Sequence, residues 1–160
     1  MDHVDKILAQ WNRERPDLDV GSMGLLGRLA RLRTHLAREV EKVLLEHGLS
    51  SPAFDVLATL RRSGAPYSLS PGDLIATTMV TSGTMTNRVD QLEKAGLVER
   101  TSNPQDGRGF IVSLTPKGFD LVERTVTAHV ANQRRLTSAL AEEERASFDL
   151  LLRKFLAAFE

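Results

Sequence analysis

Apolar side chains recur along the chain with two different periods, and the changes of period separate predicted helices from predicted strands. Near the N-terminus, Val4, Ile7, Leu8 and Trp11 follow the spacing of one buried helical face. Pro16 stops this helix, because the residue before a proline is driven out of the helical region. The chain is therefore expected to open with a short amphipathic helix.

Two longer helical patterns follow. The first runs from Gly21 to His47, carries one apolar stripe, and is closed by Gly48. The second is predicted to begin with Ser51 as its N-cap and Pro52 at its first helical position, and to end at Gly64. Both patterns are typical of helices that bury one side.

A short helix and a polar-fronted helix come next, which is a helix-turn-helix pattern. Ser70 caps the short helix, Pro71 begins it, and it is predicted to end near Thr78. The segment Val80–Arg100 then supplies a helix whose first half is crowded with hydroxyl and amide groups. At 100° per residue its core-facing side chains are Met85, Val89 and Leu92.

After Gly96 the apolar period becomes that of strands. Residues 97–102 and 109–114 read as two strands, and "NPQDGR" at 103–108 reads as the tip of a hairpin. A β-hairpin directly after a helix-turn-helix is a wing. Thr115 then caps another long helix that begins at Pro116, and the final helix has a wide apolar face formed by Phe148, Leu151, Leu152, Phe155, Leu156 and Phe159.

These elements predict a mainly α fold with a small β-hairpin wing. We expect N-terminal helices over residues 1–47, a winged helix-turn-helix domain over 50–115, and C-terminal helices over 116–160. The terminal helices have more apolar face than a small winged domain can cover, so they are expected to pack against a second copy in a homodimer. The alternative is that the long helices fold back within one chain.

Composition narrows the classes of function. The chain has 160 residues, a formal net charge of +0 and no cysteine. Any affinity for DNA must therefore come from a local patch, and thiol chemistry is excluded. The N-terminus does not read as a signal peptide and no apolar run suits a bilayer, so a cytoplasmic protein with no membrane partner is expected. Paired carboxylates, a nucleophile motif, a phosphate loop and metal-ligand spacing are absent from the sequence, so neither an enzyme, a metal nor a cofactor is expected.

The polar helix provides the candidate DNA contacts. Ser82 can cap it, and Gly83 lets its N-terminus approach a phosphate closely. Arg108 lies at the wing tip between two glycines, where a guanidinium can enter a minor groove. Arg88 lies on the flank of the helix and either contacts DNA or turns inward toward Asp55. The candidate DNA-binding residues are Ser82, Gly83, Thr84, Asn87, Arg88, Gln91 and Arg108.

The stretches "VTSGTMTNRVDQLEKAGLVER" and "NPQDGRGFIVSLTPKG" resemble the MarR family of winged-helix transcription regulators. The most specific part of the resemblance is Asp106-x-Arg108 followed by Leu114-Thr115 and Gly118. It implies a homodimer on a pseudo-palindromic operator, with recognition helices in major grooves and wings in minor grooves. It also implies that a small ligand releases the DNA, and repression is the usual mode of the family.

The N-terminal addition is similar to that of a subset of the family that responds to urate and related purine metabolites. The positions that match this subset are Trp11, Asp55, Arg88 and Arg100. Arg15 lies one turn after Trp11 on the same face, so a guanidinium could meet an anionic ligand beside that flat ring. Two alternatives stay open, namely a regulator that responds to phenolic or aromatic carboxylates and a DNA-binding protein that needs no ligand.

Overall fold

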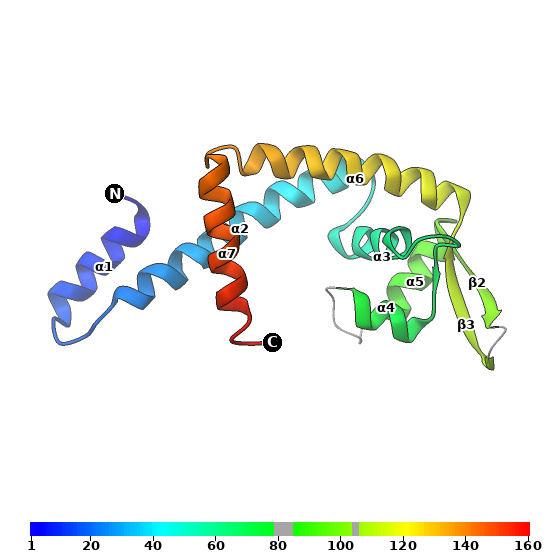
Figure 1. Cartoon of the computed structure of the whole chain (residues 1–160), viewed down its shortest axis with the longest axis horizontal. Helices are drawn as coiled ribbons and strands as arrows, with labels where there is room; N and C mark the ends of the chain where they lie inside the picture. The colour runs from blue at the N-terminus through cyan, green and yellow to red at the C-terminus, as the bar shows by residue number, and fades with distance from the viewer. Residues whose placement is uncertain (79–84, 104–105) are drawn as a thin grey trace. The chain divides into compact units, whose positions relative to one another are not determined.

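The computed structural model describes residues 1–78, 85–103 and 106–160, with the backbone alone at 106–108. The fold is mostly helical with one small antiparallel sheet (Figure 1). The chain divides into two compact units, Met1–Glu39 and Val40–Glu160, and the boundary falls inside helix α2 (Gly21–Glu46). The predicted fold class is therefore confirmed.

In the first unit, helix α1 (His3–Glu14) packs on the beginning of α2. Val4 is buried, and a Cβ added at Gly27 would lie 3.5 Å from its Cγ1. A Cβ added at Gly24 would lie 3.0 Å from Leu8 Cδ1. Two glycines on one side of α2 therefore allow the two helices to approach closely, and Arg28 of α2 adds a 2.8 Å ion pair to Asp2 at the start of α1.

The second unit contains the winged domain and the C-terminal helices. Its core is formed by apolar side chains from helices and strands that are distant in sequence: Leu49, Val56, Leu57, Leu60, Leu74, Met85, Val89, Leu92, Leu97, Val98, Val112 and Val122. Its elements are α3 (Ser51–Arg62), β1 (Ser68–Leu69), α4 (Pro71–Thr77), α5 (Met85–Lys94), β2 (Val98–Asn103), β3 (Asp106–Leu114), α6 (Pro116–Leu136) and α7 (Glu142–Leu156).

The sheet has three strands in the order β1-β3-β2, so it contains one strand more than the predicted hairpin. The extra strand β1 is two residues long and pairs with β3 through Ser68–Ser113 and Leu69–Val112. The predicted hairpin tip at 103–108 was too wide, because Asn103 belongs to β2 and Asp106 begins β3. A register shift between Ser102 and Asn103 lets the strands pair this far out.

The N-cap of α3 is Ser50, so the prediction of Ser51 was wrong by one residue. The backbone of Ser50 is extended, and its side chain accepts a hydrogen bond from the amide of Ala53. Ser51 instead bonds Glu41 of α2 through both its amide and its hydroxyl. Proline is tolerated throughout the first helical turn, so Pro52 fits either assignment. The predicted caps of α4 and α6, Ser70 and Thr115, are confirmed.

The start of α6 is attached closely to the connection between α5 and β2. The Thr115 hydroxyl donates to the carbonyl of Gly96 at 2.7 Å and accepts from the amide of Gly118 at 3.0 Å. A Cβ added at Gly118 would lie 1.9 Å from the carbonyl oxygen of Leu97. Glycine is therefore required here because helix α6 touches backbone, which cannot give way.

The end of α3 is joined to α6 by an aromatic cluster. The guanidinium of Arg61 lies 5.1 Å from the centre of the Tyr67 ring and 4.9 Å from that of Phe119, and it pairs with Glu123 at 2.6 Å. The two rings lie 5.0 Å apart. Tyr67 precedes β1 with φ of 61°, a conformation that is uncommon for a residue with a side chain, and its ring contacts help to hold it there.

The apolar face predicted for the final helix is present on α7 and open to solvent in the single chain. Its large side chains are all exposed: Phe148, Leu150, Leu151, Leu152, Phe155 and Leu156, with Phe159 just beyond the helix. Among the described residues, none of the helices is both long and apolar enough to span a bilayer.

Candidate functional site

Helix α5 has one buried and one exposed face, as expected of a recognition helix, and we call it the reading helix. Met85, Val89 and Leu92 are buried to within a few per cent, which confirms the predicted inner face. Asn87 and Gln91 are exposed, so their amides are available to a partner. The helix therefore rests on the core by one side and presents amide groups on another.

Part of the predicted DNA-contact set cannot be placed. Ser82, Gly83 and Thr84 lie outside the described residues. The backbone of Arg108 lies in β3, and its side chain is also outside the described part. Asn87, Arg88 and Gln91 are the predicted contacts whose side chains the structure brings together on one helix.

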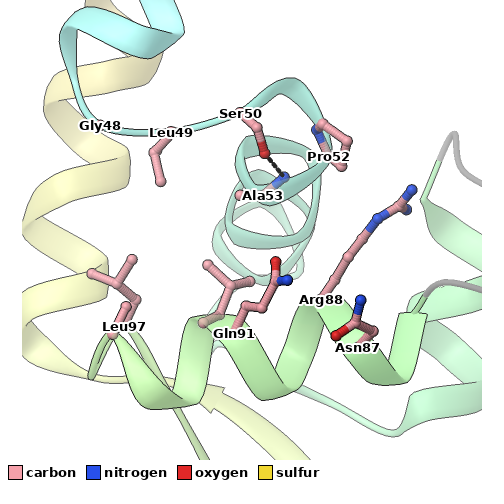
Figure 2. A pocket seen from close by; sticks show the side chains of 11 residues that line it. Gly48, Leu49, Ser50, Pro52, Ala53, Asn87, Arg88, Gln91 and Leu97 are labelled. Atoms are coloured by element: carbon pink, nitrogen blue, oxygen red, sulfur yellow. Dashed lines mark hydrogen bonds between the residues drawn. The ribbon is translucent and has the colours of Figure 1, made fainter.

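A groove of about 480 Å³ lies between α5 and the beginning of α3. Figure 2 shows Arg88 and Gln91 directed from α5 toward the first turn of α3, where the Ser50–Ala53 hydrogen bond closes the helix end. Asn87 also lines the groove, and the remaining lining is small or apolar: Gly48, Leu49, Pro52, Leu92, Ala95 and Leu97. A volume of this size suits a small molecule.

Arg88 is the charged residue among the described residues that line this groove. Its Nη1 atom is buried and has no hydrogen-bond partner in the described part of the chain. A buried guanidinium nitrogen without an acceptor is unfavourable, since it has lost water and gained nothing in return. The groove therefore offers a positive charge and one buried donor without an acceptor in the described part of the chain, which suit an anion.

Two other predicted ligand residues belong to the same unit. Asp55 is half-buried on α3. Arg100, on β2, donates from Nη1 to Glu93 at 2.8 Å and from Nη2 to Asp90, both on α5. Its guanidinium also lies 5.0 Å from the centre of the Phe110 ring.

The other two predicted ligand residues, Trp11 and Arg15, belong to the first unit. The Trp11 ring is partly exposed, and Arg15 follows α1 as its C-cap. The Arg15 guanidinium makes two hydrogen bonds to Asp17, at 2.8 and 2.7 Å. Those bonds raise the pKa of Arg15 above its ordinary value and lower that of Asp17.

The ion pairs of Arg100 were not anticipated from the sequence, although a signal for them exists. Along β2 the inward positions alternate, and Val98 is buried there. Arg100 comes two residues later, so strand period places it on the same inward face, toward α5. An arginine at an inward strand position needs acceptors, and Asp90 and Glu93 are spaced to supply them.

The described ranges contain no group of three or more histidine, aspartate or glutamate side chains that could hold a metal ion. The arrangement offers hydrogen bonding, charge and shape, which serve recognition.

Comparison with known proteins agrees with this description. The model of the MarR family matches residues 47–109, the segment that carries α3 to the start of β3. The chain is 42% identical to the HTH-type transcriptional regulator PecS of Dickeya dadantii, over 93% of this chain and 90% of PecS.

Solved structures share the fold. A mutant MarR of Escherichia coli, complexed with operator DNA, superposes with a TM-score of 0.73 at 28% identity, over 91% of this chain and 97% of MarR. BpsR of Bordetella bronchiseptica gives a TM-score of 0.73 at 26% identity, over 86% of this chain and 95% of BpsR. The chain belongs to the MarR family and is a DNA-binding transcriptional regulator, not an enzyme.

Proposed function

We propose that this protein is a cytoplasmic repressor that binds a pseudo-palindromic operator as a homodimer and is released by a small, planar, anionic ligand. Urate or a related purine metabolite is the first candidate. The observation that carries the ligand proposal is the buried Nη1 of Arg88, which has no partner among the residues that the structure describes and lies in a groove beside the reading helix. DNA binding itself follows from the family.

The exposed amides of Asn87 and Gln91 support their proposed role as contacts to base edges or phosphates. Ser82, Gly83, Thr84 and Arg108 complete the proposed DNA-contact set on the resemblance. An anion that binds in the groove would touch the same helix that carries Asn87 and Gln91. Ligand binding and DNA binding would then compete for one position of α5, which supplies the coupling that release requires.

The proposed ligand set is Trp11, Arg15, Asp55, Arg88 and Arg100, as the resemblance to the urate-responsive subset implies. Within the described ranges Nη1 of Arg88 has no acceptor, whereas Arg100 is already held by two carboxylates. An anion that recruits Arg100 would have to replace one of them. Trp11 and Arg15 stay predictions from the resemblance, and Arg15 would have to leave Asp17.

A second candidate effector class is favoured by one comparison. The DNA binding of BpsR is regulated by 6-hydroxynicotinic acid, a planar aromatic carboxylate. A carboxylate of this kind would suit a guanidinium such as Arg88. A regulator that responds to aromatic acids is therefore the alternative to one that responds to urate. A DNA-binding protein that needs no ligand is the third candidate.

The decisive measurement is fluorescence anisotropy with a labelled duplex that the purified protein selects from a randomised pool. The bound complex is then titrated with urate, 6-hydroxynicotinate and an uncharged purine nucleoside. Release by urate alone supports the first proposal, and release by the aromatic acid alone moves the protein to the second class. Binding that none of the three changes favours the ligand-independent reading.

Arg88→Gln decides between the two roles of Arg88. If Arg88 binds the ligand, the variant keeps its affinity for DNA and loses its response to the anion. If Arg88 is a DNA contact, the variant loses affinity in the absence of any ligand. Arg124→Gln, an exposed change on α6, serves as the control for an arginine removed elsewhere.

A further inference from the structure

Outside the apolar core that they share, the wing and the reading helix are linked by the side chain of Arg100. Arg100 of β2 reaches two carboxylates of α5, Glu93 at 2.8 Å and Asp90. The Arg100 side chain is 24% exposed, and those of Asp90 and Glu93 are 41% and 40% exposed. The contact is therefore partly shielded from water on the arginine side.

The sheet register explains why Arg100 points at α5. Arg100 pairs with Val112, and Ser102 pairs with Phe110, so these four side chains share one face of the β2–β3 ribbon. Val112 is fully buried, and this face is therefore the one that packs on the helices. Farther toward the tip the apolar core gives way to the Arg100 guanidinium, which is stacked on Phe110 with 5.0 Å between Cζ and the ring centre.

The stack and the two carboxylates hold the guanidinium from three sides. Its planar donors can reach two acceptors at once, and an aromatic face limits its rotation. Flexible surface pairs contribute little because their side chains are free to move. The ion pairs of Arg100 have fewer alternative side-chain conformations. They connect α5, β2 and β3, which are the elements that a winged helix places against DNA.

The cluster formed by Arg100, Asp90 and Glu93 has the wrong sign of charge to bind DNA directly. Two carboxylates face one guanidinium, so the group of Arg100, Asp90 and Glu93 carries a net charge of −1. Asp90 and Glu93 lie on the helix that must approach phosphates, and their charge opposes that approach. An electrostatic role alone would therefore favour their removal.

We infer that Arg100 is a positioning residue for DNA recognition, which fixes the wing relative to the reading helix through Asp90 and Glu93. Both must meet the same duplex, and a wing that moves independently of α5 loses part of the binding free energy to ordering. The inference rests on DNA binding by this chain and is independent of which ligand releases it.

The direction in which DNA affinity changes distinguishes positioning from a purely electrostatic effect. Asp90→Asn combined with Glu93→Gln removes two negative charges from each protomer and releases Arg100. Electrostatics alone predicts tighter DNA binding from this double variant. Positioning predicts the opposite, with affinity roughly tenfold weaker, as expected for the loss of about 1.4 kcal/mol. Anisotropy on the selected duplex, in the full chain, measures the difference.

Glu99→Gln is the matched control. Glu99 is next to Arg100 on the same strand but is exposed. Its removal deletes a carboxylate from the wing without touching the link, so DNA binding should be unchanged or tighter. A second readout is a duplex shortened at both ends. There the double variant should bind as tightly as the wild type or more tightly, because the wing no longer contributes and only the effect of the removed charges remains.

Affinity that stays level or rises in the double variant overturns the inference. If the double variant melts at a much lower temperature, Arg100→Lys replaces it, since lysine keeps the charge but cannot span two carboxylates and stack. Wild-type melting with weakened binding supports positioning, and wild-type affinity refutes it. A wild-type protein that selects no duplex would contradict DNA binding itself, which is a separate failure.

Discussion

At the scale of single residues, the surroundings of His129 on α6 favour the neutral form of its imidazole. The ring of His129 lies 5.0 Å from that of Phe54, and its Nδ1 is buried without a partner in the described part of the chain. Its Nε2 lies 2.9 Å from the amide nitrogen of Gln133. An amide nitrogen only donates, so this contact requires an accepting, neutral imidazole.

Burial lowers the pKa of His129 below its ordinary value. The unfolded chain therefore takes up a proton before the folded state does, as the pH falls through about 6.5. Stability should accordingly be intact above that pH and decrease below it. Urea unfolding at about pH 7.5 and about pH 5.5 measures this loss.

The His129→Leu variant isolates the effect of that side chain. It should be stable to a similar degree at the higher pH and lose less stability between the two pH values. An equal loss in both proteins would assign the pH dependence to other groups.

At the residue scale the sequence was informative where a local rule decides the outcome. Ser70 and Thr115 were identified as caps because a proline follows each directly and fixes the first turn. The rule was ambiguous at Ser50–Ser51, where two candidate caps precede one proline. The partners of Arg100 depend on which way β2 faces, and that is decided by its pairing with β3, where Arg100 lies opposite Val112.

At the scale of elements, α6 begins directly against the connection between α5 and β2, and we call this contact the joint of the winged unit. Gly118 has no room for a side chain, since a Cβ would lie 1.9 Å from the Leu97 carbonyl oxygen. Any substitution there must separate α6 from the connection between α5 and β2. The Thr115 hydroxyl, which bonds both sides of that joint, would lose at least one contact.

Gly118→Ala should therefore destabilise the protein by at least ~3 kcal/mol, near the upper end of single substitutions. Gly72→Ala is the matched control, because a Cβ on that helical glycine meets Ser70 Oγ at an ordinary 3.7 Å. It should leave stability unchanged or raise it by up to ~1 kcal/mol. Chemical denaturation of both variants gives the comparison, and a stable Gly118→Ala would show that the joint can open.

Elements with strong periodicity were predicted well, and elements defined by distant pairing were not. The long helix α2 and the reading helix α5 follow from their own apolar spacing. Strand β1 has two residues, too few for a period to appear, and it exists because β3 offers it an edge. The hairpin tip was misjudged because a register shift is a property of two strands together.

At the scale of the whole molecule, α7 is the element that a single chain does not explain. Leu151 is 63% exposed and Leu156 is 53% exposed, although both are large and apolar. Such a continuous apolar face on a regulator is expected to be covered by a second copy. The homodimer predicted from the sequence therefore remains our proposal for this face.

Leu152→Glu combined with Phe155→Glu should dissociate the protein into monomers, since burying two carboxylates in an apolar interface is costly. Sedimentation analysis measures the mass, and operator affinity should fall by at least ~10-fold as the second half-site is lost. Glu143→Gln, at the start of the same helix, is the control and should stay dimeric. Monomeric wild-type protein with full operator affinity would contradict the proposal.

The division of the chain into two units has a consequence for spectroscopy. The sequence contains one tryptophan and one tyrosine, and Trp11 lies in the first unit whereas Tyr67 lies in the second. Each unit therefore carries its own chromophore. Emission excited where only tryptophan absorbs follows α1. Tyrosine absorbance follows the winged unit when it is measured in a Trp11→Phe variant, because the indole of the wild type absorbs in the same band. Coincident melting curves would mean that the protein unfolds as one cooperative body, and separated curves would mean that it unfolds as two.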